Sequence, residues 1–185
     1  MRRRIFIAIN LPEDVKKELK GYQEKWPELP CRWTKKDNLH VTLMFLGYVS
    51  DEDLLDVCKA AREAVLRHAP FSVKLHKIIY GPPKKFPPRM VWAEGEKSEE
   101  LGRLYKDLEE SVSGSFQKAE ARPYAPHITL GRIRTWELKS VEPEERPDIQ
   151  EEVNLTFEVN SIEVMESQLK KGGPEYAVLE SIPLK

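Results

Sequence analysis

The sequence predicts an α+β fold with a mixed sheet. Strand-like and helix-like segments alternate in the approximate order βαβα, then ββαβ, then βββ, which favours a mixed sheet over a doubly wound parallel one. Neither of the glycine-rich nucleotide fingerprints, GxGxxG and GxxxxGK followed by Ser or Thr, occurs in the chain. The length of 185 residues suits one domain, or two small lobes that share a core.

Apolar patterning marks the first two strands and the helix between them. Residues 4–10 are apolar and β-branched and indicate a buried strand. Pro12 stands where helices commonly begin, and apolar residues then recur at helical spacing. These residues are Val15, Leu19, Tyr22 and Trp26. Residues 39–46 are expected to form the second strand, which Gly47 ends.

A second helix and a third strand follow. Ser50 precedes three acidic residues and is a typical helix start, because its hydroxyl can accept a hydrogen bond from a free backbone N–H of the first turn. The apolar face of this helix consists of Leu54, Cys58, Ala61 and Val65, and Pro70 stops it. Residues 71–80 alternate as a half-buried strand. Its buried face is expected to consist of Phe71, Val73, Leu75 and Ile79.

The second half of the chain contains one more helix and several strands. The segment GPPKKFPP (81–88) can form neither a helix nor a central strand and indicates a stiff exposed loop. A strand is expected at 89–95, a helix from Ser98 and a strand at 126–133. The apolar face of that helix consists of Leu101, Leu104, Leu108 and Val112. Residues 134–152 are rich in Pro and Glu and are expected to form an exposed loop. Three short strands then close the chain, at 153–160, 161–168 and 176–181.

The composition excludes several classes of protein. Thirty Lys and Arg against 31 Asp and Glu give a net charge of −1, which argues against a protein that coats nucleic acid and against an acidic disordered tail. No run approaches the roughly 18 apolar residues of a membrane span, and the N-terminal apolar run is too short for a signal peptide. Two cysteines cannot form a disulfide scaffold or a four-ligand zinc site. We therefore expect a cytoplasmic protein without a membrane partner. A monomer is expected, because nothing indicates an obligate dimer.

Two of the four histidines lie in near-copies of one tetrapeptide. The copies are HVTL, which begins at His40, and HITL, which begins at His127. Residues two apart in a strand share a face, so each copy presents an imidazole and a hydroxyl to one surface and two apolar side chains to a core. One such match is expected by chance in about one chain of ten, whereas two in strand contexts are much rarer. The duplication suits two similar lobes that each bring one strand to a shared cleft.

Two imidazoles and two hydroxyls on one surface suit the cleavage of a phosphodiester. Histidine titrates near neutral pH, so one imidazole can take a proton from the attacking group while the other gives one to the leaving group. The hydroxyls of Thr42 and Thr129 and a cation can hold the non-bridging oxygens as negative charge builds on them. Arg132 follows His127 by five residues and is the candidate cation. No carboxylate cluster accompanies the histidines, so we expect neither a metal nor a cofactor.

On these motifs the sequence resembles the two-histidine (2H) phosphoesterases, and within them the RNA 2′,3′-cyclic phosphodiesterases, also known as 2′-5′ RNA ligases. The resemblance covers nearly the whole chain. It includes FIAINLP (6–12), NLHVTLMFLG (38–47), PHITLGR (126–132) and ESQLKKGGPEYAVLES (166–181). It implies one bilobal α+β domain over residues 1–185, in which two pseudo-symmetric lobes, each with a mixed or antiparallel sheet, enclose a central cleft.

The resemblance also implies a role for each site residue. His40 is then the general acid that protonates the 3′ leaving oxygen, and His127 is the general base that activates water. Thr42, Thr129 and Arg132 bind the phosphate. The implied reaction opens a terminal 2′,3′-cyclic phosphate to a 2′-phosphomonoester without a metal, and some members also join RNA ends through a 2′-5′ linkage. The implied partners are RNA ends, tRNA fragments among them, or nucleotide 2′,3′-cyclic phosphates.

Two aromatic residues and three other functions stay open at this point. Phe6 and Tyr124 could stack a base, a contact of about 1–3 kcal/mol, or could belong to the core. The same fold could act on a small cyclic nucleotide or an ADP-ribose cyclic phosphate, or could be a non-catalytic module that binds RNA or nucleotides. A metal protein that uses His40 and His127 is disfavoured, because no Cys or acidic ligand lies on the same strand faces.

Overall fold

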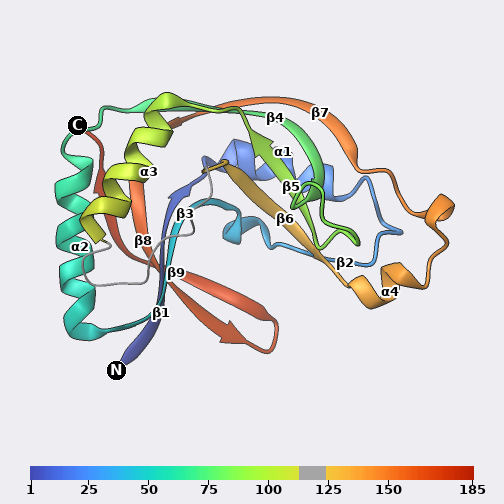
Figure 1. Ribbon diagram of the computed structural model, residues 1–185, viewed down its shortest axis with the longest axis horizontal. Helices are drawn as coiled ribbons and strands as arrows, with labels where there is room; N and C mark the ends of the chain where they lie inside the picture. The colour runs from blue at the N-terminus through green and yellow to red at the C-terminus, as the bar shows by residue number, and fades with distance from the viewer. Residues whose placement is uncertain (113–123) are drawn as a thin grey trace.

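The computed structural model describes residues 1–112 and 124–185, and its strands form one sheet in which every strand pair is antiparallel. The strands are β1 (Arg2–Asn10), β2 (Cys31–Trp33), β3 (His40–Ser50), β4 (Phe71–Gly81), β5 (Met90–Gly95), β6 (His127–Ile133), β7 (Gln150–Val159), β8 (Ser161–Lys170) and β9 (Gly173–Pro183). Their order across the sheet is β7-β4-β5-β6-β3-β1-β8-β9, and β2 pairs with β6 (Figure 1).

The sheet consists of two halves that meet at one backbone pair. Within the described residues, Val41 of β3 and Ile128 of β6 form the only residue pair that joins the halves. The N-terminal half-sheet contains β3, β1, β8 and β9, and the second half-sheet contains β6, β5, β4 and β7, with β2 on β6. This arrangement confirms the two-lobed α+β fold that the sequence predicts.

The helices cover the sheet unequally. They are α1 (Glu13–Gln23), α2 (Asp51–Val65), α3 (Glu99–Val112) and α4 (Thr135–Lys139), with 3-10 turns η1 (Lys36–Asn38) and η2 (Pro143–Glu145). Helices α2 and α3 pack together at one end of the molecule and contact β3, while α1 contacts β6 and η1 (Figure 1). None of the helices in the described ranges is long and apolar enough to cross a membrane.

The caps and apolar faces of the helices agree with the sequence. The Ser50 hydroxyl accepts a hydrogen bond of 3.1 Å from the backbone N–H of Asp53, and that of Ser98 accepts one of 3.2 Å from Leu101. Each bond satisfies a backbone donor that the first helical turn leaves free. The four predicted apolar residues of α3 are all buried. Helix α1 ends at Gln23, so Trp26 is buried beyond the helix rather than on its face.

Two strand predictions are wrong because β-bulges interrupt the alternation. Strand β3 does not end at Gly47 but continues to Ser50. Gly47 adopts φ +73°, a backbone conformation that glycine accepts without strain, so the strand can pass through it. In β4 a register shift between Leu75 and Lys77 reverses the side-chain faces. Ile78 is therefore fully buried and Ile79, predicted to be buried, is only partly so. An inserted residue turns every following side chain to the other face of the sheet.

The segment 134–152 is more ordered than its composition predicts. It contains α4, η2 and the first residues of β7, and it buries Leu138 and Ile149 completely or nearly so. The closing strands are also longer than predicted. Strand β2 was missed, because three residues are too few to show a period.

Candidate active site

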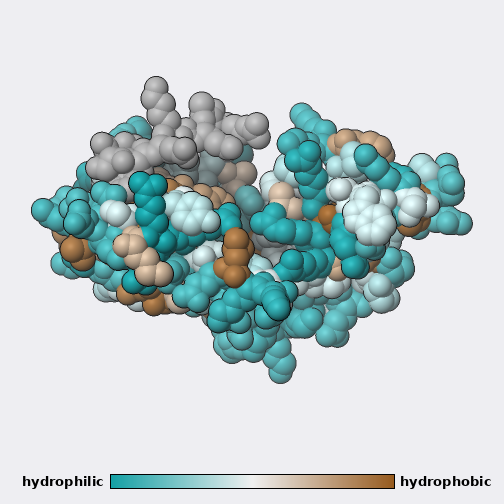
Figure 2. Space-filling view, turned by 90° about the horizontal axis from the view of Figure 1, so that it is seen from below, coloured by the Kyte–Doolittle hydropathy of each residue, from teal (hydrophilic) through white to brown (hydrophobic). Residues whose placement is uncertain are grey.

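A cleft of about 800 Å³ lies between the two half-sheets. Strand β3 contributes His40 and Thr42 to its lining, and β6 contributes His127, Thr129 and Arg132. The space-filling view shows a hollow between the two ends of the molecule, bordered mainly by hydrophilic side chains (Figure 2). The five residues that the motifs select therefore line one cavity, although the two strands are far apart in sequence.

The local geometry of the site follows from the Val41–Ile128 pair. These two residues occupy the centre of the H-x-T motifs, and both are fully buried. The residues on either side of them in each strand point to the opposite face, which is the face of the cleft. The buried apolar residue at the centre of each motif thus anchors the strand in the core, and the histidine and threonine on either side of it face the cleft.

Each histidine is fixed through Nδ1 by a backbone carbonyl two residues earlier. Nδ1 of His40 lies 2.7 Å from the Asn38 carbonyl oxygen, and Nδ1 of His127 lies 3.0 Å from that of Ala125. A carbonyl oxygen only accepts, so both imidazoles carry a hydrogen on Nδ1. Nε2 is then the nitrogen that can gain or lose a proton. The two halves of the site therefore present equivalent imidazoles.

The second contacts of the histidines differ. Nε2 of His40 lies 2.8 Å from Oγ1 of Thr42, and the ring is flanked by Phe6 at 5.1 Å and by Tyr176 at 5.3 Å between centroids. The ring of His127 instead stacks on Trp92, with centroids 3.8 Å apart and planes 20° apart. Trp92 is paired across the strands with Thr129, so β5 supplies a flat wall behind the second motif.

Burial lowers the pKa of both histidines below the ordinary value of 6.5. For His40, burial is the largest cause, the hydrogen bond to Asn38 opposes it, and the positive charges of His127 and Lys16 lower the pKa further. For His127, burial again dominates, and the Ala125 carbonyl and Glu94 oppose it. Because burial disfavours both charged rings and a charge on His127 also disfavours one on His40, the site favours at most one imidazolium near neutral pH.

The fixed charges in the described lining of the cleft are all positive. Arg4, Arg32, Lys35 and Arg132 contribute to the lining, and none of the described lining residues is Asp or Glu. Nη1 of Arg132 lies 3.6 Å from the sulfur of Met90, which leaves its other donors available. Within the described ranges, no three His, Cys, Asp or Glu side chains are grouped to hold a metal ion. This charge pattern is complementary to a phosphate.

The two predicted stacking residues are both packed against other rings. Phe6 borders the cleft but is only 2% exposed, because its ring packs against His40 and Tyr176. Tyr124 is not part of the cleft lining. Its hydroxyl donates a 2.9 Å hydrogen bond to the Thr42 carbonyl and its ring stacks on Tyr105. Both rings support the motif strands, and the geometry does not favour base stacking by either.

Several site residues were missed by the sequence analysis. Tyr176 touches the ring of His40 and belongs to a strand that is far from the motifs in the sequence. Trp92, a strand aromatic that the sequence favours as a core residue, stacks on His127 from the neighbouring strand β5. Thr34 fixes β6 through a 2.8 Å hydrogen bond from its hydroxyl to the Thr129 carbonyl. Asn38 donates a 2.7 Å hydrogen bond to the Pro174 carbonyl and so ties the start of the first motif to the β8–β9 hairpin. No local pattern signals such contacts, since they depend on strand order.

A two-lobed α+β fold that presents two histidines and two threonines to a cationic cleft defines a phosphoesterase. The family model described as LigT like Phosphoesterase matches residues 9–92 and 94–176, and the chain belongs to this family. The match confirms the two-histidine phosphoesterase resemblance that the H-x-T motifs carry.

Two known relatives that match over more than nine tenths of their length agree with this assignment. The chain is 31% identical over 178 residues to the RNA 2′,3′-cyclic phosphodiesterase of Methanocaldococcus jannaschii, which covers 96% of this chain and 98% of that protein. It is 30% identical over 182 residues to the protein of the same name from Thermotoga maritima, covering 95% of this chain and 92% of that one. Among solved structures, E. coli LigT complexed with 3′-AMP superposes with a TM-score of 0.81 at 26% identity, over 100% of this chain and 99% of that one.

Proposed function

We propose that this protein is a metal-independent RNA 2′,3′-cyclic phosphodiesterase that opens a terminal 2′,3′-cyclic phosphate to a 2′-phosphomonoester. The observation that carries the proposal is the pair of equivalent histidines, one from each half-sheet, in a cleft lined by cations. The activity named for the relatives over nearly the full length of the chain supports the same reaction.

The histidines divide the proton transfers of this reaction between them. Neutral His127 takes a proton on Nε2 from water as the water oxygen attacks the phosphorus. The bond from phosphorus to the 3′ oxygen breaks, and protonated His40 gives the proton on its Nε2 to that oxygen. The phosphate stays on the 2′ oxygen. We assign the acid to His40 and the base to His127 on the family pattern, since the contacts of Nδ1 are the same for both.

The remaining polar groups bind the phosphate. The hydroxyls of Thr42 and Thr129 donate to its non-bridging oxygens, and Arg132 balances the negative charge that builds on them. Oγ1 of Thr42 also lies 2.8 Å from Nε2 of His40. When His40 is protonated, its Nε2–H donates to this oxygen, and the hydroxyl hydrogen of Thr42 stays available for a phosphate oxygen. The same residues can run the reverse transesterification, in which a 5′-hydroxyl replaces water and a 2′-5′ linkage forms.

The proposal extends to the partners and setting of the protein. The substrates are RNA ends, including tRNA fragments, or nucleotide 2′,3′-cyclic phosphates. The protein acts as a monomer whose single domain, residues 1–185, is built from two pseudo-symmetric lobes. We place it in the cytoplasm, because Cys31 and Cys58 are both unpaired, as is usual in a reducing compartment.

The decisive experiment uses a short RNA that ends in a 2′,3′-cyclic phosphate, incubated with the protein in excess chelator. Formation of the 2′-phosphate, separated from the 3′-phosphate, is the expected result. A reaction that stops when metals are chelated would contradict the metal-independent mechanism. A folded protein without product would instead favour a different cyclic phosphate as the substrate.

The pH dependence of kcat/KM is expected to be bell-shaped with its maximum on the acid side of pH 6.5. The productive form has one neutral and one protonated histidine, and burial holds the pKa of both groups below 6.5 in the free enzyme. Raising the pH therefore removes the proton of the acid, and lowering it protonates the base. A profile from pH 4.5 to 9 measures this, and a plateau that extends beyond pH 8 would contradict it.

The threonine hydroxyls are expected to contribute less than the histidines. Thr42→Val and Thr129→Val each remove one hydrogen bond to the phosphate while keeping a β-branched side chain in the strand, so kcat/KM should fall about 5- to 20-fold. Only Thr42→Val should also shift the pH profile, because Thr42 contacts His40 directly. Equal pH profiles for the two variants would show that this contact does not influence His40.

A further inference from the structure

The cleft continues onto a face of the N-terminal half-sheet that exposes large side chains among the described residues. Arg4, Ile5 and Phe6 of β1 line the cleft, and Arg4, Phe6 and Ala8 share one face of this strand by alternation. Opposite them, β3 pairs Thr42 with Ala8, Phe45 with Phe6 and Tyr48 with Arg4. The pairing contains two register shifts, and at each of them β3 has one residue more than β1. Thr42, Phe45 and Tyr48 are therefore three residues apart and still share the cleft face. Strict alternation would have turned Phe45 away from it.

This face exposes large aromatic side chains. Phe45 is 69% exposed and Tyr48 is 67% exposed. On the neighbouring strand β8, Leu169 lines the cleft. Val178 of β9 lies on the same face as Phe6, because Phe6 pairs with Met165 and Met165 pairs with Val178. Leu169 and Val178 are 70% and 48% exposed. Exposed apolar groups that gather on one face, next to a cleft, mark a binding surface.

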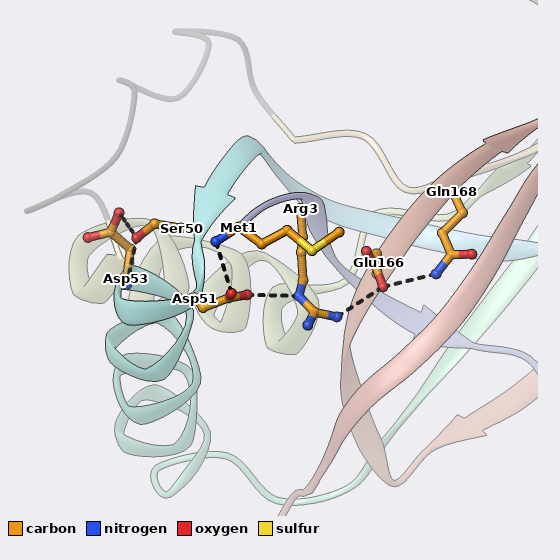
Figure 3. A network of polar contacts seen from close by, with 7 residues as sticks. All are labelled: Met1, Arg3, Ser50, Asp51, Asp53, Glu166 and Gln168. Carbon is orange, nitrogen blue, oxygen red and sulfur yellow. Dashed lines mark hydrogen bonds and ion pairs between the residues drawn. The ribbon is translucent and has the colours of Figure 1, made fainter.

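The three consecutive arginines of β1 point to different faces of the half-sheet, and only one of them forms ion pairs with described residues. Arg3 points to the side of α2, where it bonds Asp51 at 2.9 Å and Glu166 at 3.5 Å, and the N-terminal amino group also contacts Asp51 (Figure 3). Arg2 and Arg4 belong to the opposite, cleft-side face by alternation, and neither forms an ion pair with any of the described residues. On this face two arginines therefore border two exposed aromatic rings.

We propose that Arg2, Arg4, Phe45 and Tyr48 form a platform for the single-stranded RNA that lies 5′ of the terminal nucleotide. This inference rests on the proposed function, because the cyclic phosphate at the histidines fixes where the RNA ends. Bases stack on Phe45 and Tyr48, and Arg2 and Arg4 contact the phosphates between them, which is the chemistry that open sheets use for single strands. Arg4 and Ala8, which pair with Tyr48 and Thr42, are four residue steps apart in β1, about 13 Å along the strand. A mononucleotide in the cleft is therefore not expected to use Tyr48.

A substrate-length series tests the platform. For the wild type, kcat/KM is expected to rise from a nucleoside 2′,3′-cyclic phosphate to a tetranucleotide with the same terminal nucleotide. Tyr48→Ala should lower kcat/KM about 10-fold more for the tetranucleotide than for the mononucleotide, and Tyr48→Phe should restore it, because only the ring is required. Leu55→Ala removes a side chain that is 72% exposed on α2, away from the cleft, and should behave as the wild type.

A binding measurement separates failure of the platform from failure of the proposed function. Fluorescence anisotropy with a labelled tetranucleotide that carries a 2′-phosphate needs no turnover. Tyr48→Ala should raise its Kd about 10-fold, and Arg4→Gln should reduce the slope of log Kd against log salt by about 0.7, the value for one phosphate contact on a single strand. A wild type without activity on any cyclic phosphate would reject the proposed function alone. Equal Kd values for wild type and Tyr48→Ala would reject the platform.

A second copy of the chain is the competing occupant of this face. Sedimentation velocity distinguishes the two cases. One result would show that the face is a contact between copies and that the RNA platform is wrong. In that result the wild type self-associates, Tyr48→Ala abolishes the association, and the substitution leaves the RNA affinity unchanged. Association that is absent, or that Tyr48→Ala leaves unchanged, together with weaker RNA binding, supports the platform.

Discussion

Replacing either His40 or His127 by alanine is expected to lower kcat/KM for cyclic phosphate opening by at least about 100-fold, the usual contribution of a general acid or base. Both rings are held through Nδ1 by a backbone carbonyl, so Nε2 is already oriented before the substrate binds. In the proposed mechanism, His127→Ala removes the group that activates water. His40→Ala then removes the proton that the 3′ oxygen needs in order to leave.

The pH profiles of the two variants assign the roles. If His127 is the base, His127→Ala should lose the acidic limb of the profile in its residual activity, and His40→Ala should lose the basic limb. The opposite pattern would exchange the two roles without changing the pair. The double variant should be less impaired than the product of the single losses, because the two groups serve one step.

His76→Ala is the matched control. It also removes a partly buried histidine from a strand, but His76 belongs to β4 and is not part of the cleft lining. Its kcat/KM should equal that of the wild type. If either His40→Ala or His127→Ala retained nearly full activity, that histidine would have no part in the chemistry.

The H-x-T strands could be predicted from the sequence because their information is local. Alternation within His40–Thr42 fixes which side chains share a face, and the buried Val41 and Ile128 keep both motifs in register. The same reasoning located the caps of α2 and α3, since a cap bond joins residues three apart.

The surroundings of the motifs could not be predicted because they depend on which strands become neighbours. Trp92 contacts His127 only because β5 pairs with β6, and Tyr176 contacts His40 only because β9 follows β8 across the sheet from β1. The bulges of β3 have the same effect at short range. They place Phe45 on the cleft face, where a period of two residues predicts the opposite.

Gly81→Ala is expected to impair both stability and activity, because Gly81 lies directly against the ring that supports His127. A Cβ at Gly81 would lie 2.6 Å from Cγ and 2.7 Å from Cε2 of Trp92, where contacts of at least 3.4 Å are ordinary. Trp92 would have to move by about 1 Å, and it cannot do so without disturbing the His127 ring stacked 3.8 Å away. A displacement of this size in a catalytic group costs about 100-fold in rate. The overpacking itself costs about 1–3 kcal/mol of stability.

Gly102→Ala provides the control for the substitution itself. Gly102 is exposed in α3, and apart from the neighbouring helix backbone no atom of the described residues lies within 4 Å of the position that its Cβ would take. Alanine there should raise the free energy of unfolding by about 0.5–1 kcal/mol, since it restricts the unfolded chain and favours the helix. Thermal unfolding and kcat/KM measured side by side test the comparison. If Gly81→Ala unfolded at the wild-type temperature with the wild-type kcat/KM, Trp92 would be free to shift, and the stack would not be what holds His127 in place.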